Sequence, residues 1–275
     1  MIPTKKLKTG YEIPAIGYGT WDVAEKDVGV NVETALDAGY NHIDTAEGYK
    51  NEGGIGSVLE NYDRDEIFLT SKVLPSNLYY ENVIEAAEKS LVKLGTSYLD
   101  LYLIHWPNPA ISLRETLTAM KYLHDKGMVK NIGVSNFSVY QLMFAQKISK
   151  VPITVNQVEF HPYLYQKNLL DYCQENDILL EASAPLARTE VLDNPLIIEL
   201  AEKYDKTPAQ MVLRCEIEKG IVPLPKSTND EHIESNLDVL DWELQPKDHT
   251  ILDNLEEEKR VYMINLEDKT YGIRP

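Results

Sequence analysis

The chain has 275 residues, of which 44 are acidic and 27 basic, and its formal net charge is −17 at pH 7. A field of that sign repels nucleic acid, so the composition excludes a protein that binds nucleic acid by charge alone. The 43% hydrophobic content is enough for a large core. There is no apolar run of about 18 residues to cross a membrane, and no apolar signal segment follows the first six residues. We therefore expect a cytoplasmic protein.

The length fits one domain spanning residues 1–275, because a single α/β barrel takes about 250 residues. Cys173 and Cys215 have no CxxC spacing and lie in helix-like surroundings. They are therefore predicted to be buried free thiols rather than a disulfide or a metal site.

Apolar segments typical of strands alternate along the chain with amphipathic segments typical of helices. The strand-like segments are residues 15–19, 41–44, 67–71, 99–105, 131–134, 154–159, 178–183 and 221–224. The helical patterns cover residues 82–93, 112–126, 139–147, 168–176, 208–218 and 233–239. Eight strands with interleaved helices predict a single parallel (β/α)8 TIM barrel of the α/β class.

Three features fall outside the eight units. Residues 6–13, with Thr9 and Gly10 at the turn, predict a β-hairpin that plugs the bottom of the barrel. The segment after Ile251, which ends at Pro275, predicts a short irregular tail, which either frays or folds over the active-site mouth. Residues 53–56, Gly-Gly-Ile-Gly, do not give the G-x-G-x-x-G pattern of a Rossmann site and are interpreted as a loop feature.

Four polar side chains stand just beyond strand-like segments: Asp44, Tyr49, Lys72 and His105. Any one of them alone is most often a solvated loop group. In a barrel, however, the C-terminal ends of the strands meet at one rim, where the catalytic groups lie. A phenol gathered with an ammonium, a carboxylate and an imidazole forms a proton donor of tunable acidity, which suits the reduction of a carbonyl.

Five sequence motifs follow one another along the chain: residues 17–21, 44–52, 94–107, 132–137 and 222–227. In these motifs the chain resembles the aldo-keto reductase family, and more narrowly its prokaryotic-type, short-loop members that act on diketogluconate or methylglyoxal. The resemblance implies a nicotinamide-dependent reductase of aldehydes and ketones, built on a (β/α)8 barrel without a metal. We expect it to act as a monomer.

The resemblance also implies roles for the four polar residues. Tyr49 is expected to donate the proton, and since a free phenol has a pKa of about 10, Lys72 and Asp44 are expected to stabilise its phenolate character. His105 is expected to orient the carbonyl. Whether it also relays the proton together with Tyr49 at low pH stays open. Trp21 and Trp106 are expected to wall the substrate pocket, although core packing is an equal alternative for each.

The cofactor residues are likewise implied by the resemblance. Ser135, Asn136 and Gln157 are expected to hold the carboxamide of the nicotinamide, which needs both donors and acceptors. The adenosine 2′-phosphate is expected ahead of a helix that begins near Asn229, with adenine next to Asn236. The phosphate-binding residues are Lys226, Ser227 and Thr228, and the remaining cofactor residues are Gly19, Thr20, Asp44, Ser183, Pro185, Leu186 and His232.

Two residues depart from the family pattern. His232 stands where many relatives carry Arg, and imidazole lacks the permanently charged fork that binds phosphate with two hydrogen bonds. NADPH is the expected cofactor, with NADH use made credible by this change. Ser183 stands where an aromatic residue usually stacks on the nicotinamide ring, which removes a contact of about 1 kcal/mol unless another side chain replaces it.

The loop at residues 108–110 is short, which predicts an open pocket for small aldehydes and ketones, or for oxo acids and keto sugars, rather than a steroid. Two other functions stay open at this stage. One is an accessory barrel that binds the cofactor with little turnover. The other is a metal-dependent hydrolase, which the spacing of the six histidines disfavours because it contains no H-x-H or H-E-x-x-H pattern.

Overall fold

Eight parallel strands form the centre of the fold in a computed structural model that describes residues 2–262. Each strand pairs with the next along the chain. The amides of Gly17 and Gly19 donate to the carbonyls of Pro223 (3.0 Å) and Pro225 (2.9 Å), which joins the first strand of the ring to the last. The predicted TIM barrel is therefore confirmed. The strands are β3 (Tyr18–Gly19), β4 (His42–Asp44), β5 (Phe68–Val73), β6 (Leu99–Ile104), β7 (Val129–Ser135), β8 (Ile153–Glu159), β9 (Leu179–Ser183) and β10 (Val222–Leu224).

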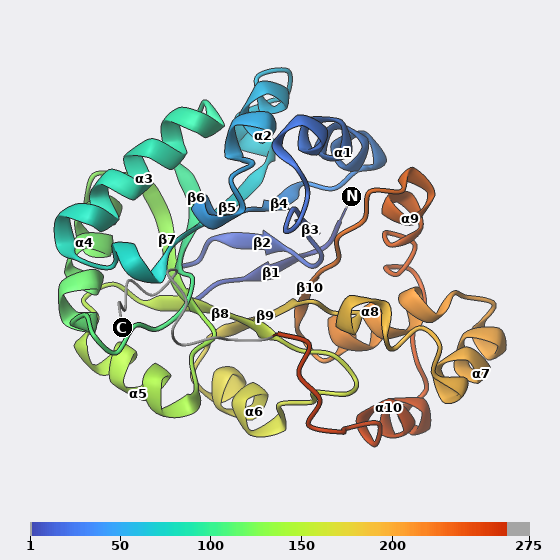
Figure 1. Cartoon of the computed structure of the whole chain (residues 1–275). Coiled ribbons are helices and arrows are strands. Elements are labelled where there is room, and N and C mark those ends of the chain that lie inside the picture. The colour runs from blue at the N-terminus through green and yellow to red at the C-terminus, as the bar shows by residue number, and fades with distance from the viewer. Residues whose placement is uncertain (1, 263–275) are drawn as a thin grey trace, which may run out of the picture.

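Helices surround the strands on the outside of the ring (Figure 1). They are α1 (Glu25–Ala38), α2 (Glu52–Leu59), α3 (Tyr80–Leu94), α4 (Leu113–Asp125), α5 (Val139–Ile148), α6 (Lys167–Glu175), α7 (Pro195–Tyr204), α8 (Pro208–Glu218), α9 (Asp230–Ser235) and α10 (Pro246–Asp253). Five of the six predicted helical patterns correspond to α3, α4, α5, α6 and α8, whereas the pattern at residues 233–239 begins inside α9 and runs past its end at Ser235. Helices α1, α2, α7 and α10 were not predicted, and the last two residues of α10 extend into the segment that was expected to be irregular.

The glycines at residues 53–56 lie inside helix α2, so their interpretation as a loop feature was wrong. A Cβ atom on Gly54 would lie 2.3 Å from the carbonyl oxygen of Glu25 in α1, and one on Gly56 would lie 2.1 Å from that of Lys93 in α3. Glycine is thus required for α2 to pack closely between its two neighbours. This packing outweighs the weak helix propensity of glycine.

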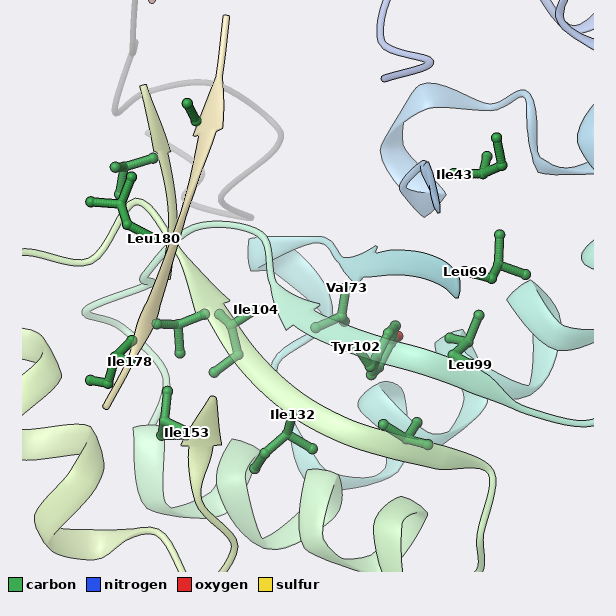
Figure 2. Packing of buried hydrophobic residues seen from close by; sticks show 14 of the residues in the cluster. Ile43, Leu69, Val73, Leu99, Tyr102, Ile104, Ile132, Ile153, Ile178 and Leu180 are labelled. Atoms are coloured by element: carbon green, nitrogen blue, oxygen red, sulfur yellow. The ribbon is translucent and has the colours of Figure 1, made fainter. Parts of the chain in front are cut away.

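The main hydrophobic core lies between the ring of strands and the helices (Figure 2). Strand residues such as Ile43, Leu69, Leu99 and Ile132 are fully buried there. Burial on both faces is typical of parallel strands covered by helices, and each such side chain stabilises the fold by about 1.5–3 kcal/mol relative to an exposed one. Cys173 and Cys215 are both buried and free, as predicted. None of the helices within residues 2–262 has the length and apolar character needed to cross a membrane.

The predicted hairpin closes one end of the barrel. Strands β1 (Thr4–Lys6) and β2 (Glu12–Pro14) pair antiparallel and lie across the ring (Figure 1). Gly10 takes a φ of +92° in the turn between them, a conformation that favours glycine. Leu7 and Ile13 are buried in a separate small cluster with side chains from inside the barrel, namely Phe68, Leu101, Leu103 and Val155.

The described part of the predicted tail folds over the opposite end of the barrel. The amides of Glu257 and Lys259 donate to the carbonyl of Tyr163 at 3.1 and 3.0 Å. The amides of Val261 and Tyr262 donate to the carboxylate of Glu159, at the end of β8, at 2.6 and 3.2 Å. The rest of the predicted tail, including residues 270–275, lies outside the described residues.

Candidate active site

The four polar residues from the strand ends meet at the rim opposite the hairpin. Asp44 ends β4, Lys72 is the penultimate residue of β5, and His105 directly follows β6. Tyr49 ends a short 3-10 turn that follows β4. The Lys72 ammonium lies 2.7 Å from the Asp44 carboxylate and 3.2 Å from the Tyr49 hydroxyl. The rings of Tyr49 and His105 meet edge to face, with centroids 5.5 Å apart.

The surroundings of Lys72 explain how a fully buried ammonium is accommodated. It has three N–H donors, and it reaches three oxygen atoms: Asp44 Oδ1, the carbonyl of Thr45 at 2.9 Å, and the Tyr49 hydroxyl. An unpaired buried ammonium would lose several kcal/mol of hydration, which the ion pair with Asp44 offsets. Lys72 is therefore held in one position against the phenol.

The two aromatic groups at the rim are both uncharged near pH 7. Burial, together with the negative charge of Asp44, raises the pKa of Tyr49 well above its ordinary value. The phenol therefore keeps its proton at neutral pH. Burial and the nearby Lys72 charge lower the pKa of His105 to about 3, so its imidazole is neutral.

A second buried carboxyl lies beneath the site. The amide nitrogen of Gln157 donates to Asp44 Oδ2 at 3.0 Å and to Glu181 Oε2 at 2.8 Å. Burial and the Asp44 charge raise the pKa of Glu181 to about 8, so this carboxyl holds a proton at neutral pH. His42 lies 3.8 Å from it and is neutral, because burial and the Lys72 charge lower its pKa to about 3. Sequence analysis did not single out Glu181.

A cavity of about 220 Å³ opens above the four residues. Tyr49 and His105 form part of its floor, and both predicted substrate residues, Trp21 and Trp106, line it. Its other lining residues are Ser135, Asn136, Gln157, Ser183, Arg188 and Tyr262. A larger apolar cavity of about 640 Å³ shares Trp106 and Asn136 with it and lies against α5, and no residue of the four-residue cluster lines it.

A second cavity, of about 380 Å³, shares Trp21, Tyr49, Gln157, Ser183, Arg188 and Tyr262 with the first and continues toward the end of β10. Many of the predicted cofactor residues line it, namely Gly19, Asp44, Gln157, Ser183, Pro185, Leu186 and Lys226. A groove of this volume leading from a carboxamide-sized polar pocket to a lysine suits a dinucleotide.

The polar groups in the groove also fit a carboxamide. The amide nitrogen of Asn136 donates hydrogen bonds to the carbonyl of His105 and to Ser135 Oγ, both at 3.0 Å. The amide nitrogen of Gln157 donates to the carboxyl groups of Asp44 and Glu181. Among the described residues no donor reaches the side-chain carbonyl oxygens of Asn136 and Gln157, and the Ser135 hydroxyl keeps its proton to donate. Two acceptors and one donor thus remain for a ligand amide.

Five predicted cofactor residues do not line either cavity. Thr20 is fully buried, and its hydroxyl donates to the carbonyl of Asp44 at 2.9 Å, so it supports that strand end. Ser227 bonds within the turn before α9, Thr228 and His232 are exposed, and Asn236 is buried. These four follow Lys226 in the chain, in the turn before α9, within that helix and directly after it.

Two residues at the mouth escaped sequence analysis. Tyr262, from the tail, hydrogen-bonds to the side chain of Ser183, and its ring lies 6.3 Å from that of Trp106. An aromatic side chain thus covers the position where the family's usual aromatic residue is missing. Arg188 follows β9 and lies over the ring of Trp21, at 4.5 Å from its centroid. The rule that loops after barrel strands carry the site could have pointed to Arg188, whereas nothing in the sequence places Tyr262 there.

Comparisons with known proteins agree with this geometry. The sequence profile of the Aldo/keto reductase family matches residues 15–257. A glyoxal reductase of Bacillus subtilis is 42% identical over 261 residues, which are 94% of this chain and 94% of that protein. The crystal structure of an aldo-keto reductase from a deep-sea metagenome library has a TM-score of 0.92 at 41% identity, covering 94% of this chain and 97% of that one.

The crystal structure of a Bombyx mori aldo-keto reductase in complex with NADP has a TM-score of 0.91 at 32% identity, covering 98% of this chain and 97% of that one. Enzymes of this family use nicotinamide cofactors, and the relatives above cover nearly the whole of this chain. The chain therefore belongs to the aldo/keto reductase family and is an oxidoreductase that reduces carbonyl groups.

Proposed function

We propose that this protein is an NADPH-dependent reductase of small aldehydes and ketones, in which Tyr49 donates the proton. The observation that carries the proposal is the contact of 3.2 Å between the Lys72 ammonium and the Tyr49 hydroxyl, on the floor of a cavity walled by Trp21 and Trp106. A phenol next to a fixed cation, at the base of a cavity, is arranged to protonate a substrate oxygen.

When bound, the reduced nicotinamide supplies the hydride that the carbonyl carbon receives. The protein's part concerns the carbonyl oxygen. His105, neutral because of its lowered pKa, donates a hydrogen bond to this oxygen and fixes its direction. Tyr49 transfers its proton to the oxygen as negative charge develops there, and Lys72 stabilises the phenolate that remains. Asp44 forms an ion pair with Lys72 and holds it in place.

The raised pKa of Tyr49 is compatible with this role. A phenol that keeps its proton across the neutral pH range is always able to donate it to the substrate. The acceptor is an oxygen that becomes an alkoxide, which is a far stronger base than a phenolate, so the transfer is favourable even from a weakened acid. The positive Lys72 counteracts the cost of the buried phenolate only once the proton has left.

The same structure supports a cofactor position along the groove from Gln157 to Lys226. Ser135, Asn136 and Gln157 offer the donor and acceptors that a carboxamide needs. Lys226 offers positive charge for the 2′-phosphate at the other end, and Ser227 and Thr228 follow it in the chain. His232, exposed on α9, does not provide the permanently charged fork of an arginine. We propose NADPH as the main cofactor and NADH as a usable one.

The substrate range follows from the volume above the catalytic groups. A cavity of about 220 Å³ holds a small carbonyl compound and is below the usual range for drug-sized ligands. The similarity to a glyoxal reductase points in the same direction. Small aldehydes and dicarbonyl compounds are therefore the first substrates to test.

The test has two steps. NADPH and NADH are first titrated against the purified protein by quenching of its intrinsic fluorescence. NADPH oxidation is then followed by absorbance with glyoxal and methylglyoxal, using the wild type and Tyr49→Phe. The proposal requires cofactor binding in both proteins and turnover in the wild type. Binding without turnover in the wild type would instead indicate an accessory, cofactor-binding barrel.

A further inference from the structure

The loop after β9 has an unusual backbone that presents one arginine to the site. Ala187, Arg188 and Thr189 have φ values of 47°, 52° and 77°, in the left-handed region that non-glycine residues seldom adopt. Turn hydrogen bonds hold the segment, from the amide of Ala187 to the carbonyl of Ala184 at 2.9 Å and from Thr189 to Leu186 at 2.8 Å. Strained backbone of this kind persists where the surrounding structure requires it, often at functional sites.

The Arg188 guanidinium lies at the junction of the two cavities. Its central carbon is 4.5 Å from the ring centroid of Trp21 and 5.8 Å from that of Tyr262. The rings of Trp21 and Tyr262 attract the guanidinium by cation–π interaction, which leaves its N–H groups unused. Arg188 lines the mouth together with Tyr49 and His105.

No carboxylate among residues 2–262 forms an ion pair with Arg188, and no hydrogen bond uses its N–H groups there. The other cation next to the catalytic groups, Lys72, is fully engaged. In a chain with a net charge of −17, an uncommitted arginine beside the catalytic residues creates a local site that attracts anions against the overall field.

We propose that Arg188 binds a carboxylate on the substrate, so that the preferred substrates are aldehydes and ketones that carry an acid group, such as oxo acids. The inference rests on the proposed reductase function and narrows its substrate class. A planar guanidinium matches a carboxylate with two parallel hydrogen bonds, which the free edge of Arg188 can supply. Its contact with Trp21 places that edge at the substrate mouth, rather than at Lys226 and the far end of the groove.

The test compares two substrates of equal chain length. Succinic semialdehyde carries a carboxylate at the end of a four-carbon aldehyde, and butanal lacks it. Both are assayed with the wild type, Arg188→Gln, Arg188→Lys and the control Arg114→Gln, whose exposed arginine is on α4, away from both cavities. Thermal unfolding checks that every variant is folded.

Arg188→Gln is expected to lower kcat/KM for succinic semialdehyde on the order of 10- to 100-fold, mostly through KM, because a hydrogen bond to a charged group is lost. Butanal should change less than about threefold by the same reasoning. Arg188→Lys should fall between, since it keeps the charge but not the fork, and Arg114→Gln should match the wild type. The KM for the acid should rise with salt in the wild type and not in Arg188→Gln.

Four results would overturn the inference. Equal losses on both substrates, or weaker NADPH binding by fluorescence titration, would assign Arg188 to the cofactor diphosphate or to loop structure. Unchanged kinetics with the acid would show that the guanidinium contacts no substrate carboxylate. A wild type that binds NADPH but reduces no carbonyl compound would refute the proposed function, and the inference with it. Butanal reduction by the wild type separates the two failures, because it shows that the reductase function holds even where the carboxylate inference fails.

Discussion

The ammonium of Lys72 lies 2.7 Å from the carboxylate of Asp44, and both side chains are buried at the rim of the barrel. Each charge makes the burial of the other tolerable, because either alone would lose its hydration without compensation. The pair also fixes the point from which Lys72 reaches Tyr49. Stability and proposed catalysis therefore depend on the same two residues.

Lys72→Met should lower the free energy of unfolding by about 3–5 kcal/mol, since it leaves Asp44 charged and unpaired in the interior. Urea unfolding measures this value. Lys121→Met is the matched control, because Lys121 pairs with Asp125 on the exposed face of α4, where solvent screens the two charges and the pair contributes little to stability. A loss in Lys72→Met as small as in the control would contradict a tightly coupled buried pair.

Tyr49→Phe should reduce kcat by at least about 100-fold, because it removes the proposed proton donor. Affinity for NADPH should stay within about twofold, since the phenyl ring is retained and only the hydroxyl is lost. The measurement pairs NADPH oxidation with fluorescence titration on the same preparation. Turnover near the wild-type level would show that another group protonates the substrate.

The barrel could be predicted from the sequence because its strands are short and apolar and alternate with helical patterns. Helices α1 and α2 were missed for opposite reasons. Glycines in α2 resemble a loop until the packing against Glu25 and Lys93 is known. Helix α1 shows only a weakly apolar stripe, so its helical state depends on tertiary contacts more than on a pattern. The assignment of the whole chain to one domain stays a prediction.

The cluster of Asp44, Tyr49, Lys72 and His105 could be predicted because the topology of a barrel brings strand ends together wherever they occur in the sequence. Glu181 and Tyr262 could not. Glu181 sits in the middle of a strand, and only the structure shows that Gln157 links it to Asp44. Tyr262 reaches the site because Glu159 binds two tail amides, a contact between residues about a hundred positions apart.

Glu181→Gln should change how stability depends on pH. The Glu181 pKa is about 8 in the folded protein against 4.5 ordinarily, owing to burial and to Asp44. Between these values the folded state keeps a proton that the unfolded state releases, so this residue's stabilisation falls as pH rises from about 5 to 8 and levels off above. The variant lacks this term, and should therefore gain stability relative to the wild type across that range.

Urea unfolding of the wild type and Glu181→Gln at pH 5, 6.5 and 8 tests this expectation. The free energy of unfolding of the variant should rise relative to that of the wild type by roughly 1.4 kcal/mol for each pH unit between the two pKa values. Glu199→Gln, which changes an exposed carboxylate on α7, controls for the loss of one charge. A stability difference that is constant with pH would show that Glu181 is already ionised in the folded protein.

His232→Arg should tighten NADPH binding roughly 5- to 10-fold, because a permanently charged fork would face the 2′-phosphate. NADH, which lacks that phosphate, should bind as before. Fluorescence titration with both cofactors gives the ratio directly. Equal tightening of both would mean that position 232 does not face the 2′-phosphate.

Tyr262→Ala should weaken NADPH binding about fivefold, the effect of losing one aromatic contact of about 1 kcal/mol. The reason is that Tyr262 covers Ser183, where the family's usual aromatic residue is absent. Adding Ser183→Trp to the same variant should restore the affinity, since the stacking surface then comes from β9 itself. Tyr11→Ala, an exposed tyrosine at the hairpin end, serves as the control. Tighter NADPH binding by Tyr262→Ala would show instead that this phenol competes with the nicotinamide for the pocket.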